Sequence, residues 1–444
     1  MHLSVLRLTL AACLMWVAAA LPARAVTLLR DSEIEYALAE LARPILNAAG
    51  LPASRTKILV IEDSSLNAFV VDGQVIFLNS GLLLKLESAA QVQAVIAHEA
   101  AHIANGHLAR RVQNVRNART ASGLGMALAG IAAASGSPEV AGGLAMGVGS
   151  SSRRVLFGHT RTEESSADQS SLRYMIRAGV DPAAAREVLE IFRGQEALSV
   201  GRQDPYVRTH PLSRDRIRAV GGLVAANPGN PGDSTSADYW FARAQGKLSA
   251  FIQNPSWTLR RTRGQTDQIS LMRQAVAYHR TPRPTEAARA INSLVSQRPN
   301  DPFVHELKGQ ILLENRQAAA AAQAYARAVQ LAPHDALILG GYGRALLAMD
   351  TRDSNARALQ VLEQARARDW RAPNLLRDLG LAYARAGRPG EASLVTAERY
   401  ALRGRLNDAL VHARRAEGLL PRGSAAWQRA QDVIFAAEQH ANRR

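Results

Sequence analysis

Two histidines and a glutamate at helical spacing are the residues of this 444-residue chain that most directly suggest chemistry. His98, Glu99 and His102 form the pattern His-Glu-x-x-His, and side chains four positions apart lie on one face of a helix. The two imidazoles can therefore bind one metal ion, while Glu99 stands close enough to polarise a metal-bound water. The pattern predicts a zinc peptidase site, although a bare match also occurs on ordinary surface helices.

A metal held by two histidines needs a third protein ligand, and a catalytic site leaves the fourth position to water. Glu164 and Asp168 are the best downstream candidates, because they stand four apart on one face of a further helix expected over residues 164–177. Glu164 can be the third ligand, and Asp168 can accept a hydrogen bond from the outer nitrogen of a ligand histidine. The alternative is a solvated acidic helix start, in which Glu163 and Glu164 stabilise the helix dipole.

The elements expected around this site are helices and one small sheet. Ser88 and Gln91 form a capping-box pair at the start of the helix that carries His98. We expect a strand over 57–63, a hairpin of 67–71 and 74–79 with a two-residue turn at Asp72-Gly73, and a helix over 31–49 interrupted at Pro44. An edge of this sheet can pair with an extended peptide substrate, or the hairpin can be purely structural.

The first 25 residues are typical of a secretory signal peptide. Arg7 precedes an apolar run over 8–20, and Ala23-Arg24-Ala25 is a small-x-small cleavage site. The only cysteine, Cys13, lies in a lipoprotein-like Leu-Ala-Ala-Cys stretch, but the long apolar run after it favours ordinary cleavage after Ala25. The mature protein then has no cysteine, so histidines and carboxylates must hold any metal.

The formal net charge of +16 allows nucleic acid, anionic membranes or acidic proteins as partners. The arginines are scattered along predicted helices without interleaved aromatics, and the leader also argues against nucleic acid, so we expect a solvated, arginine-rich surface. No segment after the leader has the ~20 apolar residues of a membrane span.

Residues 120–150, rich in glycine, alanine, methionine and leucine, form either two buried helices or an apolar flap that contacts unfolded clients or lipid.

A linker rich in proline and glycine over 227–236 precedes a region of helical repeats. Pro299-Asn300-Asp301 recurs as Pro333-His334-Asp335, and Gly309 recurs as Gly343, both at the 34-residue period of tetratricopeptide repeats. Ala321, Tyr325 and Ala328 fit the second helix of a repeat. Residues 351–354 are expected to be an insertion, after which Leu379-Gly380 and Tyr383 resume the pattern and a last helix pair covers about 391–419. The alternative is an unrelated alanine-rich bundle.

Three stretches together resemble the motifs of the gluzincin peptidases related to the CAAX prenyl protease. They are His98-Glu-Ala-Ala-His102-Ile-Ala-Asn-Gly-His107, Arg161-Thr-Glu-Glu164-Ser-Ser-Ala-Asp168 and His210-Pro-Leu-Ser-Arg-Asp-Arg216-Ile217. The resemblance implies that His98, His102 and Glu164 bind one zinc ion per chain, that Glu99 is the general base, and that Asp168 supports a ligand. Relatives often carry a further acidic residue before Ala167, where this chain has serine at no ligand position.

The same resemblance places His210 near the metal. This histidine can donate a hydrogen bond to the oxyanion of the reaction, or it can occupy the water position and silence the enzyme. As a loop residue before a proline it can also be inert. His107 and His159 are expected to be structural or solvent-facing.

With the leader and the repeat tail, the resemblance implies a periplasmic zinc endopeptidase that degrades misfolded or stalled outer-membrane proteins, with repeats that bind outer-membrane assembly machinery. The alternative is a periplasmic chaperone or adaptor with little proteolysis. The expected fold is an α+β zincin-like metalloprotease domain, mostly helical with a small sheet, followed by an all-α tetratricopeptide solenoid. The expected divisions are a signal peptide (1–25), the protease domain (26–226), a linker (227–237) and the repeats (238–444).

Overall fold

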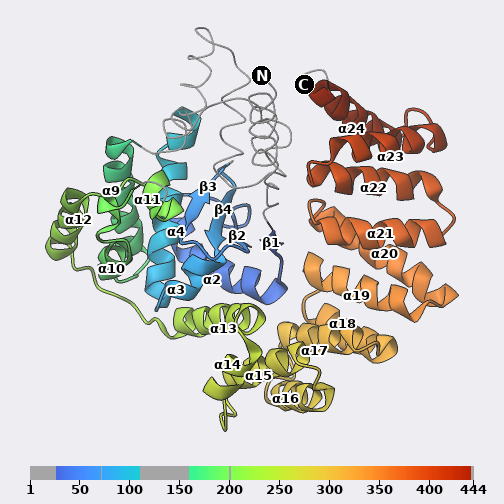
Figure 1. The fold of residues 1–444 in the computed structure, drawn as a ribbon, viewed down its shortest axis with the longest axis horizontal. Helices are drawn as coiled ribbons and strands as arrows, with labels where there is room; N and C mark the ends of the chain where they lie inside the picture. Colours follow the sequence, from blue (N-terminus) through green and yellow to red (C-terminus); the bar gives the residue numbers. More distant parts are fainter. Residues whose placement is uncertain (1–26, 72, 111–159, 200–201, 442–444) are drawn as a thin grey trace, which may run out of the picture.

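The computed structural model describes residues 27–71, 73–110, 160–199 and 202–441, and it contains a mostly helical first domain followed by stacked helix pairs (Figure 1). The expected fold class is thereby confirmed. The proposed signal peptide with Cys13, the segment 120–150 and His159 lie outside the described residues. Within the described ranges, the structure contains no helix that is both long and apolar enough to span a bilayer.

A four-stranded mixed sheet forms one layer of the first domain. Its strands are β1 (Leu28–Leu29), β2 (Lys57–Ile61), β3 (Ala68–Val70) and β4 (Val75–Asn79), in the order β1-β2-β4-β3. The central pair, β2 and β4, is parallel, and both edge strands are antiparallel to their neighbours. Among the described residues, β1 and β3 are therefore the edge strands of the sheet.

The expected hairpin is present, but its register was wrong. A two-residue turn at 72–73 would set Val70 opposite Val75, whereas Val70 pairs with Ile76. The strands are thus joined by a longer connection, in which Gly73 has a positive φ of 75°. This register points Ala68, Val70, Ile76 and Leu78 into the core, and that burial outweighs the local preference for the short turn.

Helices cover the sheet and build the rest of the first domain. They are α2 (Ser32–Ala48), α3 (Ser80–Lys85), α4 (Ala89–Ala104), α9 (Arg161–Arg177), α10 (Ala183–Ile191), α11 (Pro205–Thr209) and α12 (Arg214–Ala226), with a short 3₁₀ turn, η1, at Gln195–Ala197. The side chain of Asp31 caps α2 by accepting from the Ile34 N–H. The expected interruption of α2 at Pro44 was wrong, because Leu41 and Ile45 on either side are fully buried and hold the helix together.

Helix α4 is the central element of the first domain, packed between α2, the sheet, α9 and α10. Ser88 caps it as expected, since its hydroxyl accepts from the Gln91 N–H. The reciprocal half of the capping box is displaced by one residue, because the Gln91 side chain accepts from the Glu87 N–H and donates to Glu187 on α10. A tertiary contact thus competes with the local motif, and α4 still begins where the sequence indicates.

Helix α13 (Thr235–Ile252) follows the linker and joins the two regions. Phe241, Ala244 and Leu248 of this helix lie in the same buried cluster as α2 and α4. The helix also packs against α15 of the repeat region. The proline- and glycine-rich linker lies before α13, yet α13 packs into the core of the first domain. The expected boundary at residues 227–237 therefore remains a prediction, which a fragment that ends there would test.

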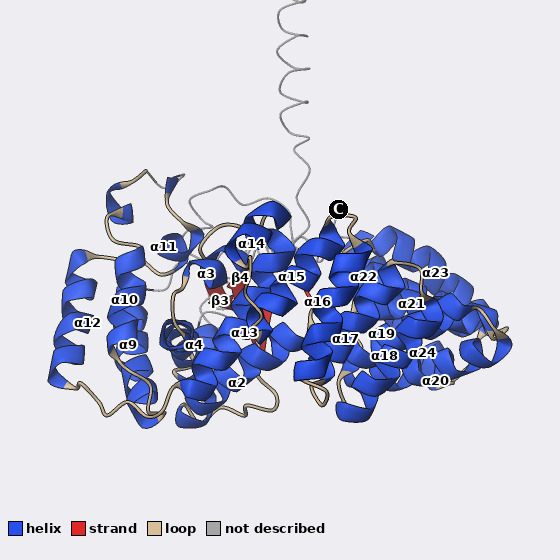
Figure 2. Ribbon diagram, turned by 90° about the horizontal axis from the view of Figure 1, so that it is seen from below, coloured by secondary structure: helices blue, strands red, loops and turns tan. Residues whose placement is uncertain are grey.

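The repeat region is a stack of helix pairs, seen from below in Figure 2. Its helices are α14 (Pro255–Arg261), α15 (Gln268–Arg280), α16 (Pro284–Gln297), α17 (Pro302–Glu314), α18 (Ala318–Leu331), α19 (Ala336–Met349), α20 (Arg352–Arg368), α21 (Pro373–Arg385), α22 (Pro389–Leu402), α23 (Leu406–Leu419) and α24 (Ala425–Ala441). The 34-residue period separates the starts of α17 and α19. Gly309 and Gly343 let neighbouring helices approach closely, because an added Cβ would lie 2.6 Å from the Tyr325 ring and 2.5 Å from Leu362 respectively.

The expected insertion at 351–354 is not a loop. Thr351 and Ser354 form a reciprocal capping box that starts α20. The extra residues are absorbed in α20, which has 17 residues where its counterpart α18 has 14. The stack therefore continues without a break, and α21 with α22 forms the next pair.

Candidate metal centre

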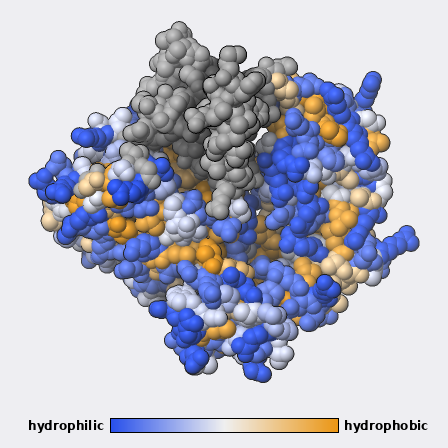
Figure 3. Space-filling model, in the orientation of Figure 1, coloured by the Kyte–Doolittle hydropathy of each residue, from blue (hydrophilic) through white to orange (hydrophobic). Residues whose placement is uncertain are grey.

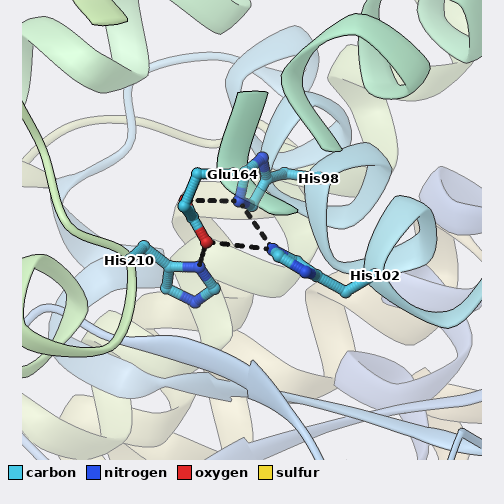
Figure 4. Close-up of side chains that lie close together, drawn as sticks. All are labelled: His98, His102, Glu164 and His210. Carbon is cyan, nitrogen blue, oxygen red and sulfur yellow. Dashed lines mark hydrogen bonds and ion pairs between the residues drawn. The ribbon is translucent and has the colours of Figure 1, made fainter. Parts of the chain in front are cut away.

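Helix α4 presents His98 and His102 from one face, toward the start of α9 (Figure 4). The two Nε2 atoms lie 3.1 Å apart, as i and i+4 positions on a helix allow. Both imidazoles and the intervening Glu99 are buried, because α4 is covered on all sides by the sheet and by other helices. The pair is therefore shielded from water, and its ring nitrogens converge on one point.

Glu164 reaches the histidines from the first turn of α9. Its Oε2 lies 3.4 Å from His98 Nε2 and its Oε1 lies 3.4 Å from His102 Nε2. Thr160 and Glu163 form the reciprocal capping box that starts α9, so Glu163 serves the helix end while Glu164 turns inward. The solvated acidic start that was the alternative for Glu164 is thus excluded by its burial.

These separations fit a zinc ion. Four ligands held tetrahedrally at 2.0–2.1 Å from zinc lie about 3.3 Å from one another. His98 Nε2 and His102 Nε2 lie 3.1 Å apart, and each lies 3.4 Å from a different oxygen of Glu164, Oε2 for His98 and Oε1 for His102. One ligand atom from each of His98, His102, Glu164 and His210 lies within 4.8 Å of the others, so these nitrogen and carboxylate donors can hold a metal ion.

The outer nitrogens of both histidines are also bound. His98 Nδ1 lies 3.2 Å from Asp168 Oδ1, the contact expected for Asp168. His102 Nδ1 lies 2.8 Å from Nδ1 of His107, so one ring donates and the other accepts. Such partners hold a ligand histidine in the tautomer that leaves Nε2 free for metal. His107 is buried, and the sequence reasoning missed this contact with the metal centre.

Asn105 at the end of α4 ties that helix to α9. Its side-chain amide donates to the hydroxyls of Ser166 and Ser170 over 3.1 and 3.2 Å. These bonds join the helix that carries the histidines to the helix that carries both carboxylates. They fix the relative position of the two halves of the centre.

Arg216, from the first turn of α12, is a second residue that the sequence reasoning did not assign. Its Nη1 lies 2.5 Å from Glu164 Oε2, and its Nε and Nη2 lie 2.6 and 2.8 Å from the two oxygens of Asp168. One guanidinium thus orients both carboxylates, a geometry that only arginine can provide. Arg216 stands within the third motif, six residues after His210. Its place in that motif is the feature of the sequence from which a role at the centre could have been predicted.

His210 completes the cluster from the end of α11. Its Nδ1 lies 3.1 Å from Glu164 Oε1, and its Nε2 lies 3.4 Å from Glu99 Oε1 and 3.4 Å from the carbonyl oxygen of Ala68 on edge strand β3. The residue is buried, and its role in the reaction remains a prediction. It stands between the third expected ligand, the expected base and the sheet edge.

The electrostatics of the centre favour a cation. Burial lowers the pKa of His98, but hydrogen bonds with Asp168 and Glu164 outweigh it and raise that pKa to about 9. Burial likewise opposes ionisation of Glu164, but His210 and Arg216 together hold its pKa well below the usual range. Burial holds the pKa of His102 well below its ordinary value, so this imidazole is neutral and has a lone pair available.

Comparison with known proteins gives a match over the first domain. Residues 29–224 match the family described as Peptidase family M48. The chain is 29% identical over 217 residues to the putative beta-barrel assembly-enhancing protease of Vibrio cholerae, which is 44% of this chain and 44% of that protein. It is 28% identical over 187 residues to the beta-barrel assembly-enhancing protease of Escherichia coli, 42% of this chain and 38% of that protein.

The matched regions thus span less than half of these two relatives. Among solved structures, the yeast Tom70 covers 82% of this chain at 13% identity and a TM-score of 0.33. A score that low supports no argument, so the repeat fold is established by the helix pairs themselves.

Proposed function

We propose that this chain, whose residues 29–224 match the family described as Peptidase family M48, is a zinc-dependent endopeptidase whose metal is held by His98, His102 and Glu164. The observation that carries the proposal is the buried cluster of these three residues with His210, whose ligand atoms all lie within 4.8 Å of one another. Cysteine plays no part in this cluster, so zinc would be bound by nitrogen and oxygen alone.

Bound zinc would polarise the scissile carbonyl and make water a nucleophile near neutral pH. Glu99 follows His98 directly on the buried face of α4 and reaches the same space. In the proposed mechanism its carboxylate takes the proton of the attacking water and later delivers it to the leaving amine. Asp168 and Arg216 keep the ligand side chains oriented and move no proton themselves.

His210 has two possible roles in this proposal. Its Nδ1 lies 3.1 Å from Glu164 Oε1, the separation of neighbouring ligands, which supports a resting state in which His210 takes the water position. Its Nε2 lies near Glu99 and the β3 edge, which supports donation to the oxyanion of a bound peptide. We propose that the resting enzyme is at least partly held in the first state and that client binding moves His210.

We further propose that the protein acts in the periplasm on misassembled outer-membrane proteins and that the repeats select the partner. The names of the two relatives support this, as does a groove in the repeat region with a volume of about 1340 Å³. Trp370, which is 56% exposed, lines this groove. On the face seen in Figure 3, apolar patches lie among polar side chains over the repeats, a surface suited to unfolded segments. Peripheral membrane contact through 120–150 is part of the same proposal.

The test compares Glu99→Gln with the parent protein. The variant should keep about one zinc per chain, measured by elemental analysis, and should lose cleavage of fluorescently labelled unfolded casein. A chelator should remove the zinc and the activity of the parent together. If the parent protein binds no zinc, or if Glu99→Gln cleaves at the parental rate, the proposed function is wrong.

The groove also supports the second candidate, a chaperone or adaptor with little proteolysis. In that case Glu99→Gln should still suppress aggregation of an unfolded outer-membrane protein as well as the parent does. Loss of this protection in the variant would favour the peptidase over the chaperone.

A further inference from the structure

Four aspartates in the repeat region stand at one spacing. Asp267, Asp301, Asp335 and Asp369 follow one another at intervals of 34 residues, which extends the two recurring positions visible in the sequence to a ladder of four. Each uses one carboxylate oxygen, Oδ1, to accept a backbone N–H near a helix end. Three of them, Asp267, Asp301 and Asp335, are N-cap residues of α15, α17 and α19.

The last three aspartates turn their other oxygen, Oδ2, toward the first domain or toward α13, which packs in its core. Asp301 Oδ2 accepts from the Arg243 guanidinium on α13, and Asp335 Oδ2 accepts from the Ser32 hydroxyl at the start of α2. Asp369 Oδ2 lies 2.5 Å from Arg30 Nη2 and 3.8 Å from Lys57 Nζ. Three successive repeats therefore hold one continuous strip formed by α13, α2 and the residue that joins β1 to α2.

The charged side chains that form these contacts are largely buried. Side-chain exposure is 6% for Arg243 and 12% for Asp301, and it is 15% for Arg30 and 7% for Asp369. Paired charges at such depth are costly to separate, because each partner left alone is desolvated without compensation. The dipole of α2 adds to the contact of Asp335, which accepts from Ser32 at the positive end of that helix.

Asp267 shows that an aspartate at this repeat position can cap a helix without pairing with the first domain. It caps α15 in the same way, with the Ser270 N–H at 3.0 Å from Oδ1. Within the described residues it forms no ion pair and no contact with the first domain. The same residue type at the same repeat position therefore exists in this chain with the local role alone.

We propose that Asp301, Asp335 and Asp369 form a docking surface whose partner is the first domain of the same chain. Each repeat contributes one carboxylate that accepts a backbone N–H near a helix end with one oxygen and contacts the strip with the other. The first domain is then a resident occupant of the early repeats, and the groove over α20 to α24 stays open to another protein. This inference concerns domain geometry and does not depend on whether the metal centre hydrolyses peptides.

The experiment measures the distance between the domains in the full-length protein. Cys13 is replaced by serine, and spin labels are attached at Arg218→Cys on α12 and Val411→Cys on α23, two positions whose side chains are highly exposed. The triple variant Asp301→Asn, Asp335→Asn, Asp369→Asn should broaden the distance distribution at least twofold. Asparagine caps helices about as well as aspartate, so the local role is preserved while the charge is lost.

Asp267→Asn is the matched control and should leave the distribution as sharp as in the parent. Broadening by this control equal to that of the triple variant would overturn the proposal, because it would assign the effect to capping. A triple variant that is as sharp as the parent would overturn it as well.

If far-UV circular dichroism shows that the triple variant does not fold, the single variants Arg30→Gln and Ser32→Ala take its place. They remove the partners of Asp369 and Asp335 and leave all four aspartates intact. Each should broaden the distribution to a smaller extent, and parental distributions in both would contradict the docking surface.

Discussion

Carboxylates outnumber permanent cations at two buried places in this molecule, the metal centre and the junction of α2, α13 and α17. At the metal centre Glu99, Glu164 and Asp168 are buried, and Arg216 forms ion pairs with Glu164 and Asp168. At the junction the carboxylates of Asp31, Glu33, Asp301 and Glu306 surround Arg243 and Lys247. In both places the carboxylates exceed the arginine and lysine side chains by two.

The two places compensate this excess in different ways. At the centre, the neutral His102 and the other histidine nitrogens converge with Glu164, so a divalent cation can supply the missing charge. At the junction no such lone pairs converge among the described residues. There, burial raises the pKa of Glu306 to about 7, with Asp31 and Glu33 adding to the rise and Lys247 opposing it. In this molecule the excess of buried carboxylate is thus accompanied by histidine nitrogens at the centre and by a raised pKa of Glu306 at the junction.

The largest effect is expected from removing a carboxylate at the metal centre. Glu164→Ala leaves two histidines that bind zinc weakly, so we expect loss of most of the metal and of all hydrolysis. Elemental analysis and casein cleavage measure both. Glu163→Gln is the matched control, because glutamine also completes a capping box, and it should keep the metal. Full zinc content in Glu164→Ala would show that the third ligand is another residue.

The next largest effect concerns where the first domain ends. A fragment of residues 26–226 lacks α13 and hence Phe241 and Leu248, whose burial is worth ~1.5–3 kcal/mol each. It also leaves Glu33 buried without Arg243 and Lys247. We expect residues 26–264 to be more stable than 26–226 by about 4 kcal/mol in urea unfolding. Equal stability of the two fragments would place the boundary at the linker.

Replacing His210 tests the metal centre without removing an expected ligand. If His210 blocks the water position at rest, His210→Ala raises the rate of casein cleavage and can lead to self-cleavage, with zinc content little changed. If it only stabilises the oxyanion, the same change lowers turnover by a factor of ~10²–10³. The sign of the change decides between the two roles, and an unchanged rate would contradict both.

The smallest effect is expected at the junction and depends on pH. Because the pKa of Glu306 is raised to about 7 in the fold, its contribution to stability is present below its unfolded pKa near 4.5 and is lost as pH rises through 7. Glu306→Gln imitates the protonated form, so its stability relative to the parent should rise between pH 5 and pH 8, by about 1–3 kcal/mol. Urea unfolding at both pH values measures this.

Glu314 on the same helix provides a control of opposite sign. A hydrogen bond from His279 lowers the pKa of its carboxyl group, so its ionised form is favoured in the fold. Glu314→Gln should therefore become less stable than the parent as pH rises from 4 to 6. The same sign in both variants would contradict the assignment at Glu306.

Local rules in the sequence determined several features of this protein without help from the fold. The spacing of His98 and His102 sets both imidazoles on one face of a helix, because four residues complete about one turn. The caps at Asp31 and Ser88 and the 34-residue period were likewise readable, since each depends on backbone within a few residues or on direct repetition. Glu164 and Asp168 were found as a pair by the same helical spacing.

Only the tertiary structure decided how these parts meet. The contacts of Arg216 with Glu164 and of His107 with His102, the register of the β3–β4 hairpin and the unbroken α2 all depend on burial against distant segments. The docking of Asp301, Asp335 and Asp369 is the clearest case. Their spacing is visible in the sequence, and Asp267 shares it, yet only packing brings three of the four carboxylates against the first domain. Local geometry is set by the covalent chain, whereas a contact between distant residues depends on how whole helices pack.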